Sequence, residues 1–536
     1  RDWSSDVCSS DLIFREASVW LNEELLGQFD LPYLPFACPL WEAVQPGSNT
    51  LLIRIDNRLT YDELPVATKF HDGKHGWFPY GGLYRPIYIE HLPPIYPQKV
   101  LFETDGEQQL NLLVQLQNLT DRQQMLQVEL GEIIVDKLQP LDQVVISTPA
   151  TPSQNDGQHD WARGQQWVKY TKQFEKVRPW DVDIPGNVQT YYLKISRPTA
   201  GGGFQQLAMY TYNWAFKQFE LEDGGQYRLN DYPIVLKGIN RHEDHYLLGP
   251  RYTDNLLDGD IGFMKSMEVN FCRPGHYPND VRVLQKLEEA GILIVEEIPV
   301  YQLNKSQMAD SHLIAQSKAM LHRMIIRDYN RPGICMWSIG NEVHYWRKSA
   351  RKYMQMLHNY AKQLDPRRET FQARLLLPPF IERIAFKDRV SDITDVTGLN
   401  TYHGWYYSKA SKAGKHIRRI YNKMPEQHFI ISEFGAGAKR GKHVEEVEQN
   451  EPRKNHTYSE EFQAQLLTTH LKQYIELPFI NGVMPWVLAD FRMQWTPNTG
   501  KPHPHEKTNL KGLLDMNRKP KAGLDAVYQQ YKDWRP

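Results

Sequence analysis

The sequence predicts a multidomain fold in which two β-sandwiches, the second of them immunoglobulin-like, precede a C-terminal (β/α)8 TIM barrel. First, 536 residues are too many for one ordinary domain. Second, short alternating apolar runs separated by turns fill the chain up to about residue 218, which is typical of sandwiches. Third, apolar strands alternate with amphipathic helices from about Phe219 onward, which indicates a parallel sheet. We expect domains at 13–96, 97–218 and 219–536.

The first twelve residues, RDWSSDVCSSDL, look like a translated sequencing-adapter scar, and we set Arg1–Leu12 aside from the fold. A native start and any signal peptide would then be missing. The compartment is therefore left undefined, and we expect a soluble protein that is cytoplasmic or periplasmic.

The first sandwich is predicted from β-rich runs at Ala17–Leu21 and Thr50–Ile55, which are separated by turn residues at Gln45–Asn49. A glycine turn at Gly81 enters a further strand that reaches Ile89. In the second sandwich the runs Leu110–Leu116 and Tyr191–Ile195 stand between loops rich in Pro, Gly, Asn and Asp. The polar stretch Ala150–Gln166 is predicted to be an extended surface loop. Neither sandwich concentrates chemically active residues, so both are interpreted as scaffold.

The barrel is predicted from about eight strand–helix units in about 300 residues. Clear helical patterns cover Asp280–Ala290 and Glu460–Tyr474. The candidate strands are Ile234–Ile239, Val269–Cys272, Ile292–Val295, Cys335–Ile339, Phe371–Leu375, Val396–Leu399, Phe429–Ser432 and Val483–Val487.

The chain is organised around the stretch RDYNRPGICMWSIGNE. A helix end and the turn Asn330–Gly333 precede the apolar run Ile334–Ile339, which is typical of a strand buried on both faces. Glu342 follows directly. In a (β/α)-barrel, residues just past the C-terminal ends of the strands build the active site.

A second carboxylate, Glu433, follows the apolar run Phe429–Ser432 in the same way. The 91 positions from 342 to 433 correspond to three strand–helix units, which places the pair on strands four and seven, across the barrel mouth. One glutamate at a strand end is usually a surface ion pair. Two of them favour a catalytic pair, because glycoside cleavage needs two carboxylates that flank one bond.

Several segments resemble family 2 glycoside hydrolases. NRPGICMWSIGNE is similar to the acid/base motif of that family and HFIISEFGAG to its nucleophile motif. LKGINRHEDH, NFCRPGHYPND, LEEAGILIVEEIP, NTYHGWYY and GVMPWVLADF match further blocks in the expected order. VWLNEELLG, GSNTLLIRIDN and YGGLYRPIYI resemble the second half of the N-terminal jelly roll, which implies a partial jelly roll that lacks its first half.

The resemblance implies roles for named residues. Glu342 would be the general acid/base and Glu433 the nucleophile of a retaining mechanism, with the two carboxyls ~5–5.5 Å apart. Asn341 would bond the sugar 2-hydroxyl and Tyr402 would hold Glu433. Other residues would support the pocket floor or wall the sugar ring, although each aromatic taken alone is equally typical of core packing: His242, Arg273, His276, Trp405 and Trp486.

The segment Thr508–Gly512 bears on the substrate. Asn509 and Lys511 resemble the Asn-x-Lys motif with which β-glucuronidases bind the sugar carboxylate, and an ammonium is suited to an anionic group. β-Glucuronidases carry an aspartate before the Gly-Gly turn, whereas this chain has His75–Tyr80 there, a form closer to β-galactosidase-like members. The insertion Trp495–Lys507, with its two histidines, could shape a subsite or be a solvated loop.

Composition excludes several other classes of protein. The formal net charge is -1, which gives no indication of nucleic-acid or anionic-membrane binding. No segment approaches the ~20 apolar residues of a membrane span. The four cysteines (Cys8, Cys38, Cys272 and Cys335) show neither disulfide nor zinc spacing, and we predict no metal and no cofactor.

The leading hypothesis is therefore a retaining exo-β-glycosidase, β-glucuronidase-like, with a carbohydrate substrate as its partner. A β-galactosidase or a related enzyme acting on polysaccharide fragments is the alternative, and formation of a homo-oligomer is left open. A non-catalytic carbohydrate-binding protein is the hypothesis from another class. Loss of turnover in Glu433→Ala would exclude that third hypothesis.

Overall fold

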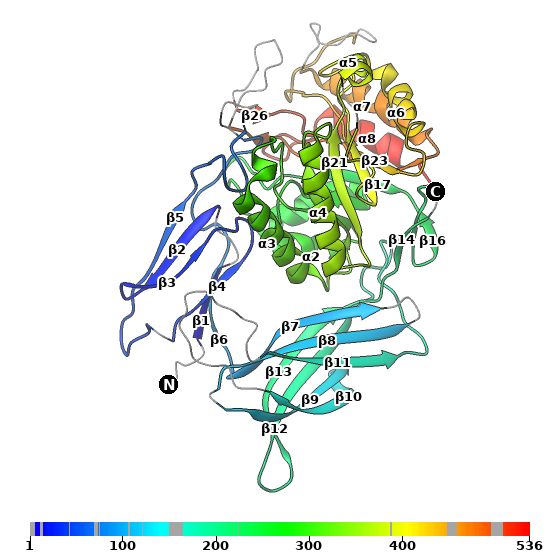
Figure 1. Ribbon diagram of the computed structural model, residues 1–536. Helices are drawn as coiled ribbons and strands as arrows, with labels where there is room; N and C mark the ends of the chain where they lie inside the picture. Colours follow the sequence, from blue (N-terminus) through cyan, green and yellow to red (C-terminus); the bar gives the residue numbers. More distant parts are fainter. Residues whose placement is uncertain are drawn as a thin grey trace.

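The computed structural model describes residues 6–10, 14–41, 43–68, 73, 75–104, 108–120, 122–148, 165–222, 224–385, 388–447, 458–494 and 507–536. A barrel ringed by helices forms the upper body of the molecule, with one group of β-sheets beside it and another below it (Figure 1). The predicted multidomain fold with a C-terminal (β/α)8 barrel is confirmed.

Eight parallel strands close the barrel in chain order. They are β17 (Leu236–Asn240), β18 (Phe271–Arg273), β19 (Leu293–Glu297), β20 (Ile334–Asn341), β21 (Glu369–Leu375), β22 (Val396–Asn400), β23 (His428–Glu433) and β24 (Ile480–Val483). The surrounding helices are α1 (Asp254–Ser266), α2 (Val281–Glu289), α3 (Ser311–Asp328), α4 (Lys348–Leu364), α5 (Pro379–Ala385), α6 (Ala413–Tyr421), α7 (Glu460–Ile475) and α8 (Ala522–Tyr531), with 3-10 turns η2 (Gln307–Ala309) and η3 (Ala410–Lys412).

The predicted eighth strand, Val483–Val487, was wrong in its position, because β24 ends at Val483. The apolar residues that follow leave the regular ladder. The N–H of Val487 donates to the carbonyl of Lys511, and the N–H of Leu488 donates to that of Asn240. These residues are apolar because they are buried at the rim, not because they continue a strand.

The barrel interior is filled with side chains, and its base is covered. The short sheet β14–β15–β16 (Phe219–Leu221, Tyr227–Leu229, Tyr232–Ile234) lies between the second sandwich and the barrel (Figure 1). Trp180, Tyr227 and Leu229 pack in one cluster with interior residues of the strands, among them Leu236, Phe271, Leu293, Val295, Met336, Phe371 and Met484. The lower end of the barrel is therefore a packed core rather than an opening.

The second sandwich pairs a sheet of order β10-β9-β12-β13 with one of order β11-β8-β7, an immunoglobulin-like arrangement. Its strands are β7 (Ile95–Thr104), β8 (Gln109–Asn118), β9 (Gln124–Ile134), β10 (Lys137–Thr148), β11 (Gln165–Gln173), β12 (Gln189–Pro198) and β13 (Phe204–Trp214). Leu110, Leu112, Val114 and Leu116 are all buried, as their alternation predicts. The predicted loop Ala150–Gln166 falls outside the described residues except for its last two, which begin β11.

The first sandwich contains sheets of order β4-β1-β6 and β3-β2-β5. Its strands are β1 (Asp6–Ser10), β2 (Glu16–Leu21), β3 (Glu24–Phe29), β4 (Phe36–Pro39), β5 (Leu51–Asp56) and β6 (Ile87–His91). The backbone of Asp6–Ser10, within the segment we set aside, pairs with both β4 and β6. The core is small and consists of Ala17, Val19, Leu21, Phe36, Cys38, Leu40 and Ala43.

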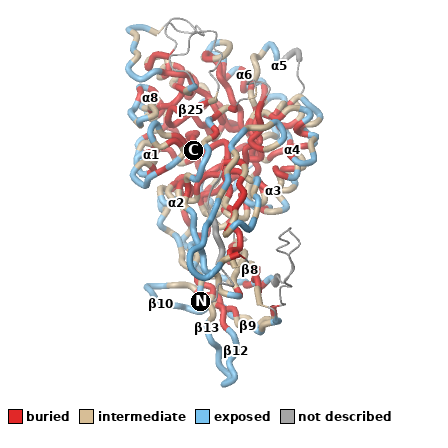
Figure 2. Tube along the Cα trace, turned by 90° about the vertical axis from the view of Figure 1, so that its left-hand side faces the viewer, coloured by how far each residue is buried: buried red, intermediate tan, exposed pale blue. Residues whose placement is uncertain are grey.

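Burial is concentrated in the barrel, and the sandwiches expose more of their chain (Figure 2). A buried ion pair connects the first sandwich to the barrel, since Arg85 contacts Glu243 at 3.0 Å and Asp280 at 3.4 Å. Among the helices of the described segments, none is both long and apolar enough to cross a membrane.

Candidate active site

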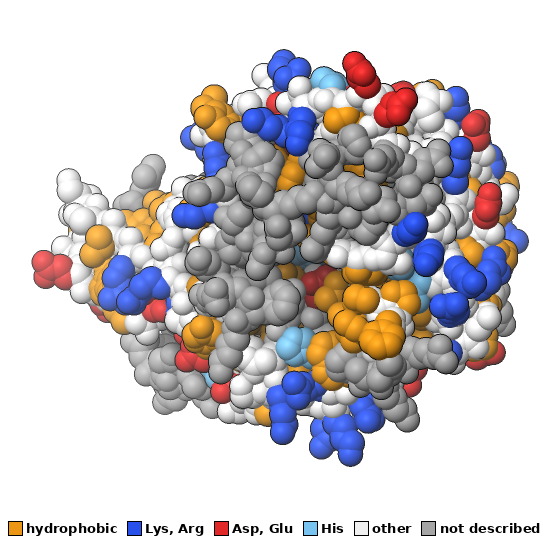
Figure 3. Space-filling model, turned by 90° about the horizontal axis from the view of Figure 1, so that it is seen from above, with side chains coloured by type: hydrophobic (Ala, Val, Ile, Leu, Met, Phe, Trp, Pro, Cys, Tyr) orange, Lys and Arg blue, Asp and Glu red, His pale blue; other side chains and the backbone are white. Residues whose placement is uncertain are grey.

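Six barrel strands each end in a polar or charged residue, so the C-terminal rim carries a ring of functional groups. Seen from above, the rim surrounds a hollow in which acidic side chains are visible, with hydrophobic side chains along one border (Figure 3). The six terminal residues, all buried, are Asn240, Arg273, Glu297, Asn341, Asn400 and Glu433.

Glu433 ends β23 and receives two strong hydrogen bonds. Nη1 of Arg273 donates to its Oε1 at 3.0 Å, and the phenol of Tyr402 donates to its Oε2 at 2.7 Å. Nε2 of His276 lies 3.9 Å from Oε1. A cation and a phenol that point at one carboxylate stabilise its charged form.

Glu342 directly follows β20 and has a left-handed backbone conformation, with φ of 51°. Neutral amides hold its carboxyl group: Nδ2 of Asn400 donates to Oε1 at 3.0 Å, and Nε2 of Gln302 donates to Oε2 at 2.9 Å. Burial, followed by the charge of Glu433, raises the pKa of Glu342 above its usual value, although the two amide bonds act in the opposite direction. Burial and the charge of Glu433 therefore move Glu342 towards the carboxylic acid, the form that a proton donor needs.

Arg273 is the centre of the polar network at the rim. Its guanidinium is fully buried and donates to Glu433, to Oδ1 of Asn341 at 3.0 Å and to Oδ1 of Asn240 at 3.2 Å. It also forms a two-pronged pair with Glu297, at 2.9 and 3.1 Å. One cation on β18 thus connects the ends of four other strands, β17, β19, β20 and β23.

Glu297 balances the charge of Arg273. Burial alone would raise the pKa of Glu297, but Arg273, His276 and the hydroxyl of Ser338 lower it to about 2. Ser338 Oγ donates to its Oε2, and Nδ1 of His276 lies 2.8 Å from its Oε1. Glu297 therefore stays ionised and fixes the guanidinium in position.

Asn341 is oriented by two donors that both reach its carbonyl oxygen. Nη2 of Arg273 lies 3.0 Å from Oδ1, and Nδ2 of Asn400 lies 3.1 Å from it. Asn400 donates to Asn341 and to Glu342, and Ser432 Oγ donates to its Oδ1 at 2.6 Å. The amide of Asn341 is therefore held by its oxygen, and among the described residues no acceptor bonds its Nδ2.

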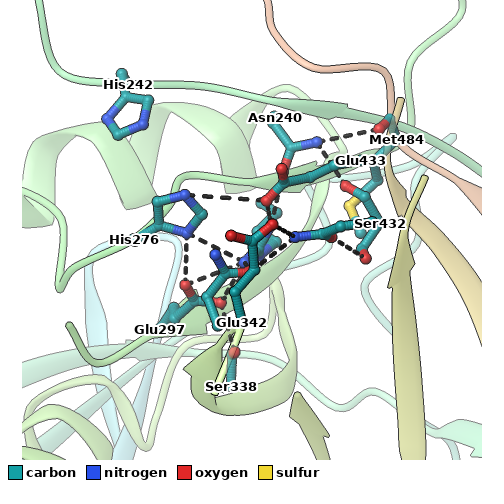
Figure 4. Close-up of polar contacts among 12 residues, drawn as sticks. Asn240, His242, His276, Glu297, Ser338, Glu342, Ser432, Glu433 and Met484 are labelled. Carbon is teal, nitrogen blue, oxygen red and sulfur yellow. Dashed lines mark hydrogen bonds and ion pairs between the residues drawn. The ribbon is translucent and has the colours of Figure 1, made fainter. Parts of the chain in front are cut away.

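Aromatic side chains, among them Trp486, lie beside this network. The rings of Trp486 and His276 are nearly parallel, 5.0 Å apart and at 16° to each other. His242 stacks on Phe491 at 4.1 Å and stands apart from the bonded residues in Figure 4. Burial, then the charges of His276 and Arg273, lowers the pKa of His242 well below its usual value, so this ring is neutral.

The first sandwich takes part in the rim, which corrects our interpretation of that domain as scaffold alone. The ring of Trp77 lies 5.5 Å from that of His276, and its Nε1 donates to the hydroxyl of Tyr33 at 2.8 Å. Trp77, Tyr33 and Phe14 belong to the same buried cluster as Tyr402, Trp405 and Trp486.

Lys511 lies in an aromatic cage close to Glu433. Its Nζ donates to the hydroxyl of Tyr406 at 2.9 Å and lies 5.3 Å from the centre of the Tyr402 ring and 5.7 Å from that of Trp405. Asn509 orients the segment, because its Oδ1 accepts from the N–H of Lys511 at 3.1 Å. Within the described part of the chain, no carboxylate forms an ion pair with Lys511.

A small pocket opens at this cage. It is lined by Trp405, Tyr406, Gly437, Tyr458, Asn509, Leu510 and Lys511. Tyr402 joins the pocket to the carboxylates, since its ring faces Lys511 while its hydroxyl bonds Glu433. A cationic pocket one side chain away from a carboxylate suits a ligand that is anionic at one end.

Sequence reasoning missed several residues of this site. Glu297, Asn240 and Asn400 end barrel strands, so the rule that selected Glu342 and Glu433 could have found them. Gln302 and Trp77 had no such signal. The predicted insertion Trp495–Lys507 lies outside the described residues except at Lys507. In the described ranges no three His, Cys, Asp or Glu side chains gather as metal ligands.

Comparison with known proteins places this geometry in a family. The model of glycosyl hydrolases family 2, TIM barrel domain, matches residues 219–535. A β-glucuronidase of Streptococcus agalactiae is 25% identical over 95% of this chain and 82% of that protein. A protein of Formosa agariphila is 24% identical over 97% of this chain, which spans only 60% of that protein's length.

Solved structures agree in fold. The crystal structure of a GH2 β-galacturonidase from Eisenbergiella tayi bound to galacturonate has a TM-score of 0.81 and 23% identity, and it covers 98% of this chain and 87% of that one. Since the family model spans more than half of the chain and includes every barrel strand, the chain belongs to glycosyl hydrolase family 2.

Proposed function

We propose that this chain is a retaining exo-β-glycosidase that acts on terminal β-linked hexuronic acids, with β-glucuronides as the first candidates. The observation that carries the proposal is the contrast between the two rim glutamates. Glu433 is held by a guanidinium and a phenol, whereas Glu342 is held by amides and has a raised pKa. A retaining enzyme needs one ionised nucleophile and one protonated acid.

In the first step, the Glu433 carboxylate attacks the anomeric carbon and forms a glycosyl ester. Glu342 gives its proton to the glycosidic oxygen as the bond to the leaving group breaks. Arg273 and Tyr402 donate hydrogen bonds to Glu433 and hold its carboxylate in position within the buried site.

In the second step, the charge of Glu433 has been consumed in the ester. The pKa of Glu342 then falls, because the carboxylate that raised it is gone. Glu342 therefore acts as a base, takes a proton from water and directs that water to the anomeric carbon, which releases Glu433. Two inversions retain the configuration of the sugar, and no cofactor is required.

Asn341 is positioned to read the sugar. Both hydrogen bonds to its side chain reach Oδ1, which leaves Nδ2 to donate to the 2-hydroxyl. Such a bond strengthens as positive charge develops at the anomeric carbon.

A uronic acid is favoured by the charge of the neighbouring pocket. Lys511 offers its ammonium beside Tyr406 and Asn509, and the donors suit the carboxylate on C5 of a hexuronic acid. The Streptococcus relative is a β-glucuronidase and the Eisenbergiella relative a β-galacturonidase, and both names specify a hexuronic acid as the glycone.

The test compares nitrophenyl β-glucuronide with nitrophenyl β-galactoside, for the unmodified chain and for Lys511→Ala. We expect glucuronide to be preferred, and its kcat/KM to fall in the variant by about 1.5–3 kcal/mol, or ~10–150-fold, because a charge-assisted bond is lost. Lys519→Ala, at an exposed lysine of the same region, is the matched control. Galactoside preference that is indifferent to Lys511 would contradict uronide recognition.

A neutral β-galactosidase is the second candidate, and one observation favours it. The segment His75–Tyr80 has no aspartate before the Gly-Gly turn, and its Trp77 reaches the rim instead. The same assay decides between the two candidates.

A further inference from the structure

We propose that Asp490 and Lys521 are a buried positioning pair that sets the separation between Lys511 and the strand of Glu433, and with it the preference for sugars that carry a carboxylate. The inference rests on the proposed function, since it concerns how the same pocket selects its sugar. Neither residue lines the pocket. They act through the backbone that carries Lys511.

Lys521, which precedes α8, has a fully buried ammonium. Its Nζ donates to Oδ1 of Asp490 at 2.7 Å, to the carbonyl of Ala438 at 2.8 Å and to that of Leu510 at 3.2 Å. An ammonium has three donors, so this one is saturated. A charge of this kind, buried and fully bonded, defines a geometry closely.

The three acceptors belong to three segments of the rim. Ala438 lies on the chain that continues from Glu433, and Leu510 directly precedes Lys511. These two segments also bond each other, since the N–H of Ala438 donates to the carbonyl of Leu510 at 2.8 Å. The ammonium therefore fixes the segment of the nucleophile against that of Lys511.

Asp490 holds the other side of Lys511. Its Oδ1 accepts from the N–H of Gly512 at 2.8 Å, and its own N–H donates to the carbonyl of Leu514 at 3.0 Å. This approach requires glycine, because a Cβ at Gly512 would lie 2.2 Å from the Asp490 nitrogen. The backbone is thus held immediately before and immediately after Lys511.

An uncharged side chain reinforces the same arrangement. Nε2 of Gln463, on α7, donates to the carbonyls of Ala436 at 2.9 Å, Gly512 at 3.1 Å and Lys511 at 3.3 Å. Gln463 therefore links the same two segments without a charge and offers an independent way to loosen them.

The geometry matters because a pyranose ring is rigid. When the anomeric carbon is at Glu433, the carboxylate of a uronic acid lies at a fixed offset, and Lys511 has to meet it there. A misplacement of about 1 Å can cost on the order of 100-fold in rate. A neutral sugar lacks the carboxylate and depends less on this offset.

The experiment measures kcat and KM for nitrophenyl β-glucuronide and nitrophenyl β-glucoside in Asp490→Asn, Lys521→Met, the doubly neutral Asp490→Asn/Lys521→Gln, and Gln463→Met. We expect the glucuronide-to-glucoside ratio of kcat/KM to fall by about tenfold or more. In a Lys511→Ala background the same changes should leave the ratio where Lys511→Ala alone puts it.

Asp365→Asn is the matched control, since Asp365 is a buried, ion-paired aspartate at the opposite end of the strands. Asp365→Asn should lower the stability of the fold without changing the glucuronide-to-glucoside ratio of kcat/KM. Equal losses for both substrates, with folding verified by thermal unfolding, would overturn the inference. If the variants that remove a charge do not fold, Gln463→Met provides the test. An unchanged glucuronide-to-glucoside ratio of kcat/KM in Gln463→Met would overturn the inference as well.

The two proposals fail in different ways. In one case, the glucuronide-to-glucoside ratio of kcat/KM falls in Lys511→Ala and stays unchanged in the variants of Asp490, Lys521 and Gln463. That result overturns only the proposal of a positioning pair. A ratio that is indifferent to Lys511→Ala overturns uronide recognition and the positioning pair together.

Discussion

Two side chains of the same type differ at this rim because of their neighbours. A guanidinium and a phenol donate to Glu433, whereas two neutral side-chain amides donate to Glu342. Burial and the Glu433 charge then raise the pKa of Glu342. In the proposed mechanism, the acid and the nucleophile are thus distinguished by their environment, since both are glutamates.

The raised pKa of Glu342 predicts a pH-dependent stability. The folded chain binds this proton more tightly than the unfolded chain, so the contribution is present below the ordinary pKa of about 4.5 and is lost as pH rises through the folded-state pKa. Glu342→Gln keeps the neutral form, so its melting temperature should exceed that of the unmodified chain at pH 8, and the difference should vanish below about pH 4.5. Thermal unfolding from pH 4 to 8 measures this.

Glu445→Gln, at an exposed carboxylate, is the control and should show no such trend. A destabilisation by Glu342→Gln that is the same at every pH would contradict the assigned shift.

The barrel strands are the elements that bring the site together, and their close packing is specific. Gly398 on β22 faces neighbours on both sides, since an added Cβ would lie 2.4 Å from the Phe371 ring and 2.5 Å from Ser432 Oγ. Ser432 in turn bonds Asn400, which bonds Glu342. Packing between strands is therefore coupled to the orientation of the acid.

Gly398→Ala should destabilise the fold by about 1–3 kcal/mol, because the extra methyl overpacks the barrel. It should also lower kcat, because Ser432 and Asn400 are displaced. Gly262→Ala is the control of opposite sign: it lies in α1 with open space around its Cβ position, so alanine should stabilise by ~0.5–1 kcal/mol. Denaturant unfolding measures the two changes in stability. Equal stability of Gly398→Ala and Gly262→Ala would contradict the overpacking argument.

The elements of the barrel could be predicted because a parallel strand buried on both faces is a continuous apolar run between turns. The strand that precedes Glu342, β20, is buried along its whole length, as its sequence indicates. The rule failed at Val483–Val487, where burial at the rim produces the same pattern without a strand.

The candidate site was predictable to the extent that it lies at strand ends. Glu342 and Glu433 were found in that way, and Glu297 could have been. Trp77 could not, because its position against His276 depends on how the first sandwich packs on the barrel. Positions of that kind are set by tertiary contacts between distant segments, which no local pattern records.

At the scale of the whole molecule, the first sandwich and the barrel are joined by buried charge. Arg85 is enclosed between Glu243 and Asp280, and the aromatic cluster around Trp77 continues across the same junction. The sandwich is therefore part of the wall of the site and is held there by an ion pair shielded from water.

Arg85→Met should destabilise the protein by about 3–5 kcal/mol, because Glu243 stays buried without its cation and Asp280 keeps only its pair with Arg282. Because the junction carries Trp77, KM should also rise. Arg58→Ala, which removes an exposed surface pair, should change neither stability nor KM. Chemical unfolding together with steady-state kinetics checks both expectations, and intact stability in Arg85→Met would contradict the role of the junction.

The covered base of the barrel has a consequence for turnover. In the described residues, the lower end of the barrel is closed by Tyr227, Leu229 and Trp180. The barrel interior above them is packed with side chains. A sugar freed at the rim therefore departs through the same mouth by which the next substrate arrives. Arrival and departure exclude each other there, so we expect the liberated sugar to compete with the substrate for the rim, and its exit to be a step of turnover.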